Sequence, residues 1–552
     1  MAAMSIRLPG LGNPTVTGSP PVKSERGRSI IRVSLNGERG GGSNSESGNR
    51  SLKATGAQPR AVSTDVQTVF TSSDDATTST SSGLPLRDVP GCYGIPFVGA
   101  FWDKMATYWF EGMPGFHENR RVKYNSTVYR MNTVPGPPFF PDPRVIVLLD
   151  QKSFQTLFDM DKVEKRDVFT GTYVPSLEFT GGYRVLPYLD PSEEKHALLK
   201  TFCFEVLKSS GKRVFPEFHS ALSDVFVAWE AGLKKDGNVK FNQALAQATL
   251  RFNIKAFLNV DPTDPNVEAN MGKDAVRIVN LYNLAQIFPT VAFPLSLPAK
   301  LFLGPLIELL LHTFPVPFLL LKPNYDKLLA FFRANSDVLL DVAETLTLDR
   351  DEALHNLLFN TVFNSWGGIN FLFPQIVKTL GSTSIVFQRE LSAEVRRAIR
   401  ENGGLNPAAL RAMPRVESAV LEVFRLHPPV PFQYARAKKD LIIESHDAAF
   451  RVKKGEMLAG FNTLACKDPK VFTDPEVYNP DRFLGEEGQK LVQCVLWSNG
   501  PQTDTPSIYN KQCPGKNFIT TIAQLLVAEI YSIYETISVQ GDTLTALQRH
   551  SA

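Results

Sequence analysis

The chain has 552 residues, of which 43% are hydrophobic and 21% are charged, and its formal net charge is +3. This composition is that of a globular protein with enough apolar residues for a large core. No basic tract alternates with aromatic residues, so nucleic acid is excluded as the expected ligand. The five cysteines are scattered and contain no CxxC pair, which argues against a disulfide scaffold or a zinc site and indicates a reducing compartment.

Residues 1–82 differ in composition from the rest of the chain. They are rich in Ser, Thr, Gly and Pro and poor in apolar residues, so this segment is predicted to be disordered. It contains many basic residues and, before residue 60, only Glu25, Glu38 and Glu46 as acids. A Ser-rich, Arg-rich and acid-poor N-terminus without a long apolar run is typical of a transit peptide. We interpret 1–82 as a plastid-targeting segment, with an unstructured cytosolic tail as the alternative.

Two patterns in the first half of the folded part are informative. Val145–Leu149 is a short apolar run of the β type. Asp190-Pro191-Ser192 is a helix-start signal, and His196 and Lys200 follow it at i and i+4, which places both on one face of the expected helix. By themselves these two residues are most simply a surface pair.

Between Val214 and Leu348 the apolar spacing predicts mainly helices. The most apolar part is Leu295–Leu321. Repeated prolines in it break any continuous helix and argue against a membrane-spanning segment. The sequence is equally consistent with a patch at a lipid interface and with a buried core segment.

The stretch from Leu357 to Gly368 is apolar enough for a buried helix, yet it contains Asn364 and the pair Gly367-Gly368. Glycines inside a helix cost about 1 kcal/mol each relative to alanine, and close approach of a ligand is a reason to keep them. No Asp or Glu occurs between Leu354 and Leu372. The polar group that this helix offers is therefore a neutral amide, which both donates and accepts hydrogen bonds.

Further along the chain, Glu422 and Arg425 lie at i and i+3 and are predicted to form a buried ion pair that Arg482 completes. Residues 441–461 have the alternation and turns of a short β-region.

Cys513 precedes Pro514-Gly515 and an apolar-periodic segment, so it lies where a helix begins. Unpaired N–H groups and the positive end of the helix dipole stabilise a thiolate at such a position. A thiolate is a soft, electron-donating axial ligand for haem iron. A buried structural cysteine is the alternative for this motif taken alone.

Three motifs together resemble the haem-thiolate, or cytochrome P450, superfamily: Glu422-Val423-Phe424-Arg425, Pro480-Asp481-Arg482-Phe483 and the cysteine loop Trp497–Phe518. Trp497 replaces the usual Phe of that loop, and Pro501–Tyr509 lengthens it. These two features resemble the plant fatty-acid-hydroperoxide branch, which comprises allene oxide synthases, hydroperoxide lyases and divinyl ether synthases. The resemblance implies a mainly α fold with a small β-region, forming one haem domain over residues 83–552.

The resemblance also implies the site. Its cofactor would be haem b with Cys513 as the iron ligand, and the residues matching propionate partners are Lys165, His196, Lys200, Lys511 and Arg436. Phe169 matches an aromatic that faces the substrate, in a loop over the haem, and Asn364 matches an amide that positions the hydroperoxide. Asn370 departs from the family pattern, because many relatives have there a lysine near the substrate carboxylate.

The function implied is that of an allene oxide synthase, which dehydrates a fatty acid hydroperoxide such as 13-hydroperoxy-linolenate without O₂, a reductase or another redox partner. Hydroperoxide lyase is the alternative within the branch. A conventional monooxygenase and a non-catalytic lipid- or haem-binding protein are alternatives from other classes. The expected location is the chloroplast, with peripheral membrane contact and no transmembrane helix; a cytoplasmic location is the alternative.

Overall fold

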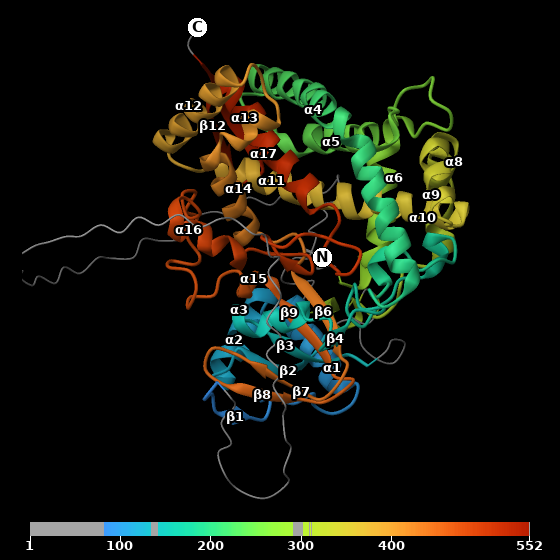
Figure 1. Cartoon of the computed structure of the whole chain (residues 1–552), viewed down its shortest axis with the longest axis vertical. Coiled ribbons are helices and arrows are strands. Elements are labelled where there is room, and N and C mark those ends of the chain that lie inside the picture. The colour runs from blue at the N-terminus through green and yellow to red at the C-terminus, as the bar shows by residue number, and fades with distance from the viewer. Residues whose placement is uncertain (1–81, 134–141, 291–301, 308–309, 311, 551–552) are drawn as a thin grey trace, which may run out of the picture. The chain divides into compact units, whose positions relative to one another are not determined.

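The computed structural model describes residues 82–133, 142–290, 302–307, 310 and 312–550. Residues 1–81, nearly all of the predicted targeting segment, lie outside this part. The described chain is mainly helical, and most of the strands lie together at one end of the helical part, as Figure 1 shows. There an early segment (blue) and a late segment (orange) build the β-region together, which confirms the predicted fold class.

The helices follow one another along most of the described chain. In chain order they are α1 (Val98–Met105), η1 (Ala106–Phe110), α2 (Met113–Tyr124), α3 (Gln151–Phe154), α4 (Glu194–Asp236), α5 (Phe241–Leu258), α6 (Ala275–Ile287), α8 (Phe318–Asn335), α9 (Asp337–Thr345), α10 (Arg350–Leu358), η7 (Phe359–Trp366), α11 (Gly367–Leu380), α12 (Ile385–Glu401), α13 (Pro407–Arg411), α14 (Pro414–Leu426), α15 (Asn462–Ala465), α16 (Gly485–Leu491) and α17 (Lys516–Ile533). The segments η1 and η7 are π-helical, with i→i+5 hydrogen bonds.

The largest sheet has five strands in the order β2 (Val128–Asn132), β3 (Arg144–Leu148), β9 (Met457–Phe461), β6 (Phe432–Ala437) and β4 (Val163–Glu164). Strands β3 and β9 are parallel and the other pairs antiparallel. Smaller sheets join β1 (Leu86–Arg87), β8 (Ala449–Val452) and β7 (Leu441–Glu444); β12 (Tyr534–Gln540), β13 (Thr543–Arg549) and β5 (Val239–Lys240); and β10 (Leu496–Trp497) with β11 (Gly500–Pro501).

Alternation along the strands explains why the five-stranded sheet is buried on both faces. Ile146 and Leu148 belong to one apolar cluster, whereas Val145 and Val147 belong to another on the opposite face. The run Val145–Leu149 thus forms the predicted strand, and residues 441–461 form β7, β8 and β9 as expected.

Helix α4 connects the two helical cores. Its first half packs Leu199 and Phe202 with α6, α8, α10 and η7, while its second half packs Leu222 and Trp229 with α5, α11, α14 and α17. The helix starts at Glu194, as the signal at Asp190 predicted, and so carries His196 and Lys200 on its first turns.

Candidate active site

A mainly apolar cavity of about 230 Å³ lies between the first turns of α4, the η7–α11 helix and the start of α17. Six of the residues predicted from sequence line it: Phe169, His196, Lys200, Asn364, Lys511 and Cys513. The fold therefore brings together residues that are up to 344 positions apart (513 − 169) in the chain.

Cys513 lies at the bottom of the cysteine loop, three residues before the first residue of α17. Its backbone N–H donates to the Ser498 carbonyl (3.2 Å), and its own carbonyl accepts from the Lys516 N–H (3.2 Å). Gly515 is the N-cap of α17. Pro514 therefore lies before the helix and not at its first position.

Cys513 lines the cavity, and the neighbouring groups shift the pKa of its thiol in opposite directions. Burial raises the pKa of the Cys513 thiol, and this outweighs the lowering by the Gly515 N–H, by nearby Lys200 and by the Trp497 side chain. The Gly515 N–H at the helix start favours the thiolate, as the sequence argument expected, and burial of the sulfur acts against it. A bound cation would favour the thiolate form, because metal binding to a cysteine releases its proton.

Four basic residues surround one side of the cavity: Lys165, His196, Lys200 and Lys511, called here the basic cluster. Lys165, His196 and Lys200 are buried. Within the described residues, Lys165 Nζ and His196 Nδ1 have no hydrogen-bond partner. Lys200 Nζ donates to the Asn510 carbonyl (2.5 Å), and Lys511 Nζ donates to the carbonyls of Leu186 (3.0 Å) and Leu189.

Burial is the main cause of strong pKa shifts throughout the basic cluster. It lowers the pKa of Lys165 to about 7, of Lys511 to about 7, of Lys200 to about 8 and of His196 to about 3. The neighbouring cations lower the pKa of Lys511 and His196 further, while Asp190 opposes the shift of Lys165.

The basic cluster therefore has more positive than negative charge. Asp190 acts on Lys165, His196 and Lys511, but its carboxylate already accepts the Lys165 backbone N–H (2.6 Å) and the Ser192 side chain. Buried cations require charge partners. A dianionic cofactor such as haem, with its two propionates, fits these unpaired donors.

Two residues matched to propionate partners do not line the cavity. Lys165 directly follows β4 and is not a lining residue, but its charge acts on Lys511, which is one. Arg436 lies on β6 opposite Glu164, and its guanidinium donates to the Gly455 carbonyl (3.1 Å). The roles of both residues remain predictions.

Asn364 lies on η7, which the sequence predicted as a buried helix but not as a π-helix. Such segments are rare and frequently occur at functional sites. Asn364, Gly367 and Gly368 all line the cavity, and a Cβ added to Gly368 would meet no described atom within 4 Å. The glycine pair thus keeps backbone open to the cavity. Among the described residues that line it, none carries a carboxyl group.

Phe169 lies at the boundary between this cavity and a smaller one that Phe432 and Tyr434 line. Its ring makes edge-to-face contacts with Tyr188 (centroids 5.6 Å apart) and Phe363 (6.3 Å). The neighbour of Asn364 on η7 thereby helps to fix the position of the Phe169 ring. The loop before it begins with a short strand, β4, where the sequence predicted loop throughout.

Among the polar residues of the cavity that sequence reasoning missed are Cys203, Asn283 and Asn360. Asn360 was detectable, because it precedes Asn364 by four residues and so shares its helix face. Cys203 was likewise detectable, since it follows Lys200 by three residues on the predicted helix. Asn283 carries no such signal, since only the packing of α6 against η7 brings it to the cavity.

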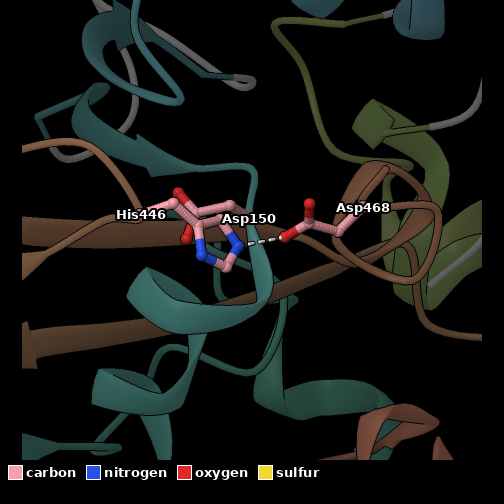
Figure 2. A group of neighbouring side chains, drawn as sticks. All are labelled: Asp150, His446 and Asp468. Atoms are coloured by element: carbon pink, nitrogen blue, oxygen red, sulfur yellow. Dashed lines mark hydrogen bonds and ion pairs between the residues drawn. The ribbon is translucent and has the colours of Figure 1, made fainter. Parts of the chain in front are cut away.

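A second group of metal-ligand type lies outside the cavity. Asp150, His446 and Asp468 lie close together beside the five-stranded sheet (Figure 2). Asp150 caps α3 by accepting the Ser153 N–H (2.8 Å), and Asp468 accepts from His446 (2.7 Å) and from the Gln151 N–H (2.9 Å). Because these carboxylates are already bonded, the group serves to join loops to the sheet.

The described helices include none that is both long and apolar enough to cross a bilayer. The apolar segment predicted at 295–321 is described in part, and there several side chains are exposed, including Phe302 (85%) and Leu306 (56%). This part of the segment is not a buried core.

Comparisons with known proteins give consistent relatives. The cytochrome P450 family model matches residues 386–538. An allene oxide synthase, chloroplastic, from Arabidopsis thaliana is 45% identical over 85% of this chain and 88% of its own length. An allene oxide synthase from Parthenium argentatum is 44% identical over 85% and 99%, and a divinyl ether synthase from Selaginella moellendorffii is 42% identical over 83% and 94%.

Proposed function

Because the chain belongs to the cytochrome P450 family, in the group of its allene oxide synthase relatives, we propose that it dehydrates fatty acid hydroperoxides to allene oxides. The reaction removes one water from the hydroperoxide and is redox-neutral overall. It therefore requires no O₂, reductase or other redox partner.

One observation carries this proposal: the cavity at Cys513 combines an amide and an aromatic ring with a lining that has no carboxyl group among the described residues. A haem b bound through Cys513 would supply cleavage of the O–O bond. Cys513 would hold the iron, and Lys165, His196, Lys200 and Lys511 would bind the propionates. Arg436 would assist from the sheet side.

Asn364 would hold the hydroperoxide group by hydrogen bonds from its neutral amide. A monooxygenase needs an acidic group that delivers protons to bound O₂, and the amide does not supply one. The apolar lining excludes water from the substrate carbons near the cleaved bond.

Phe169 would act on the fate of the substrate after cleavage. The face of an aromatic ring carries negative π-density and stabilises a nearby cation. The electron that the allylic substrate radical loses would pass to the bound haem, and the ring would stabilise the resulting carbocation, whose loss of a proton completes the dehydration.

The test uses the purified haem protein and the 13-hydroperoxide of linolenic acid, without O₂ and without reductant. We expect the hydroperoxide to disappear with formation of ketols and cyclopentenones from the allene oxide. Cys513→Ser should lose the thiolate absorption spectrum and this activity. A protein that consumes substrate only with NADPH and a reductase would be a monooxygenase, and one that never consumes it would be a binding protein.

Phe169→Leu separates the synthase from the hydroperoxide lyase alternative. Leucine keeps volume but lacks the π-face, so the substrate radical should persist, recombine with the hydroxyl group formed by O–O cleavage and fragment to aldehydes. A difference of about 1–2 kcal/mol between the two exits changes the product ratio roughly ten-fold. Chromatography of the products measures the ratio; unchanged ketol and cyclopentenone yields would assign Phe169 to packing alone.

We further propose that residues 1–82 direct the protein to the chloroplast, as the names of two relatives indicate for those proteins.

An exposed apolar patch is proposed to contact a lipid surface. The patch lies on two adjacent segments, which meet where Met105 and Trp109 pack against Ile307. Its members are Ile95, Phe97, Val98, Trp102, Phe110, Phe302, Leu303, Leu306, Leu310, Leu319 and Leu320. Trp102→Ser with Leu306→Ser should reduce co-sedimentation with galactolipid vesicles.

A further inference from the structure

Asn364 is hydrogen-bonded to a second amide in the same cavity. Its Nδ2 donates to Asn360 Oδ1 (2.8 Å), and Asn360 Nδ2 donates to the sulfur of Cys203 (3.0 Å). Asn360 and Asn364 are four residues apart on η7, and Cys203 lies on α4, three residues after Lys200. All three residues line the cavity.

The order of donors and acceptors along this row determines which way the Asn364 amide points. An Asn side chain has one oxygen and one nitrogen end, and its terminal torsion is soft, so an isolated amide rotates readily. Turning the Asn364 amide over would place its oxygen against Asn360 Oδ1, where two acceptors repel. Asn360 is oriented by its N–H₂ group, which donates to the Cys203 sulfur, so reversing the row would require both amides to turn together and the Cys203 S–H to donate instead.

This arrangement leaves Asn364 Oδ1 available. Within the described residues, no donor bonds to that oxygen, whereas Asn364 Nδ2 uses one of its two N–H bonds to donate to Asn360. The amide therefore presents an acceptor to the cavity. A hydroperoxide or an alcohol has an O–H that can donate to it, whereas a ketone has only acceptors.

We propose that Asn360, held by Cys203, is a positioning residue that fixes the Asn364 amide with its oxygen toward the substrate, so that the site selects oxygen groups that donate a hydrogen bond. This inference rests on the proposed function for the identity of the ligand. The cavity would thus bind the hydroperoxide and the corresponding alcohol, and discriminate against the ketone of the same chain.

The test measures binding and not turnover. Calorimetry on the haem protein gives the dissociation constants of the 13-hydroxy and 13-keto analogues of the hydroperoxide, which differ only at the oxygen group. One hydrogen bond to a neutral group makes a difference of roughly ten-fold. We expect the wild type to prefer the hydroxy acid by about this factor. In Asn360→Leu the freed amide can turn its N–H₂ to the keto oxygen, so the preference should fall to about two-fold or less.

Two further variants distinguish positioning from a general packing defect. Cys203→Ala should reduce the preference in part, while Cys203→Ser, which retains an acceptor, should restore it. A packing defect would weaken both analogues equally and leave their ratio unchanged. If Asn360→Leu does not retain haem, the two Cys203 variants decide the question alone. In Asn364→Ala the preference should be absent, and Asn360→Leu should add nothing to it.

An equal affinity of the wild type for both analogues, or an undiminished preference in Asn360→Leu or Cys203→Ala, overturns the inference. Failure of the proposed function looks different: the preference would be present, but the hydroperoxide would not be consumed without reductant.

Discussion

The protein contains two buried groups of charged residues that differ in one respect. The basic cluster of Lys165, His196, Lys200 and Lys511 has donors without partners. The group Glu422, Arg425 and Arg482 is closed: Glu422 accepts from Arg425 (2.6 and 2.7 Å) and from Arg482 (2.9 Å).

The rest of the closed group is equally well bonded. The remaining Arg425 donors reach the carbonyls of Cys466 (3.0 Å) and Pro475 (2.7 Å), and both Glu422 and Arg425 are fully buried. This group has no capacity for a ligand and joins α14 to the segment before the cysteine loop. The comparison shows that buried charges do not by themselves indicate a binding site. In the described part of this protein, buried donors without hydrogen-bond partners in the basic cluster indicate one.

Of the three predictions that follow, Glu422→Gln should have the largest effect, because it breaks the closed group. The variant leaves two guanidinium groups in the core without a countercharge, and breaking such a pair costs about 3–5 kcal/mol of folding free energy. We expect a large fall in the midpoint of denaturant unfolding for both the haem-loaded and the haem-free protein. An unchanged midpoint would show that the group is not structural.

Lys165→Met should have opposite effects in the two forms. Losing a charge-assisted hydrogen bond of about 1.5–3 kcal/mol should weaken haem affinity roughly 10- to 100-fold. The haem-free protein should become more stable, because the variant no longer buries an unpaired cation. Haem transfer to apomyoglobin measures the first effect and denaturant unfolding the second. Lys208→Met, at an exposed lysine of α4, is the control and should change neither. A loss of stability without haem would place Lys165 among the structural residues.

The smallest expected effect is the pH dependence of the stability that Lys165→Met adds to the haem-free protein. The pKa of Lys165 is lowered from 10.5 to about 7 in the folded protein, so between these values the unfolded chain binds a proton that the folded chain does not. The loss of unfolding free energy caused by burying Lys165 is thus complete at and below pH 7 and disappears as the pH rises toward 10.5. The advantage of Lys165→Met over wild type, both haem-free, should shrink across this range. A constant difference would contradict an unpaired Lys165.

How much the sequence could predict depended on whether the signal was local. The Glu422–Arg425 spacing and the helix start at Asp190 are local patterns, and the structure confirms both. The roles given to Phe169 and Asn364 came from resemblance, and the structure adds only that they share a cavity with Cys513. The link from Asn360 to Cys203 could not be predicted, because it depends on how α4 packs against η7.

The pKa of the Cys513 thiol is a second property that a local sequence pattern does not determine. Its place before a helix is readable in the sequence, but the effect of burial on its pKa is a property of the whole fold. The local argument identified the position and the favourable N–H group of Gly515, but not the opposing effect of burial.

The π-helical geometry of η7 constrains how the length of this chain can vary. A π-turn holds one more residue than the α-turn it replaces, and one residue corresponds to about 100° of rotation in an α-helix. Deleting a single residue between Phe359 and Trp366 would let this segment return to α geometry while α11, including Gly367 and Gly368, keeps its rotation toward the cavity. The same deletion within the α-helical part of α10 would have no extra residue to absorb it and would rotate everything after it by about 100°. Homologues that lack one residue within η7 are therefore expected to keep the face that α11 presents to the cavity, whereas those that lack one residue in α10 are not.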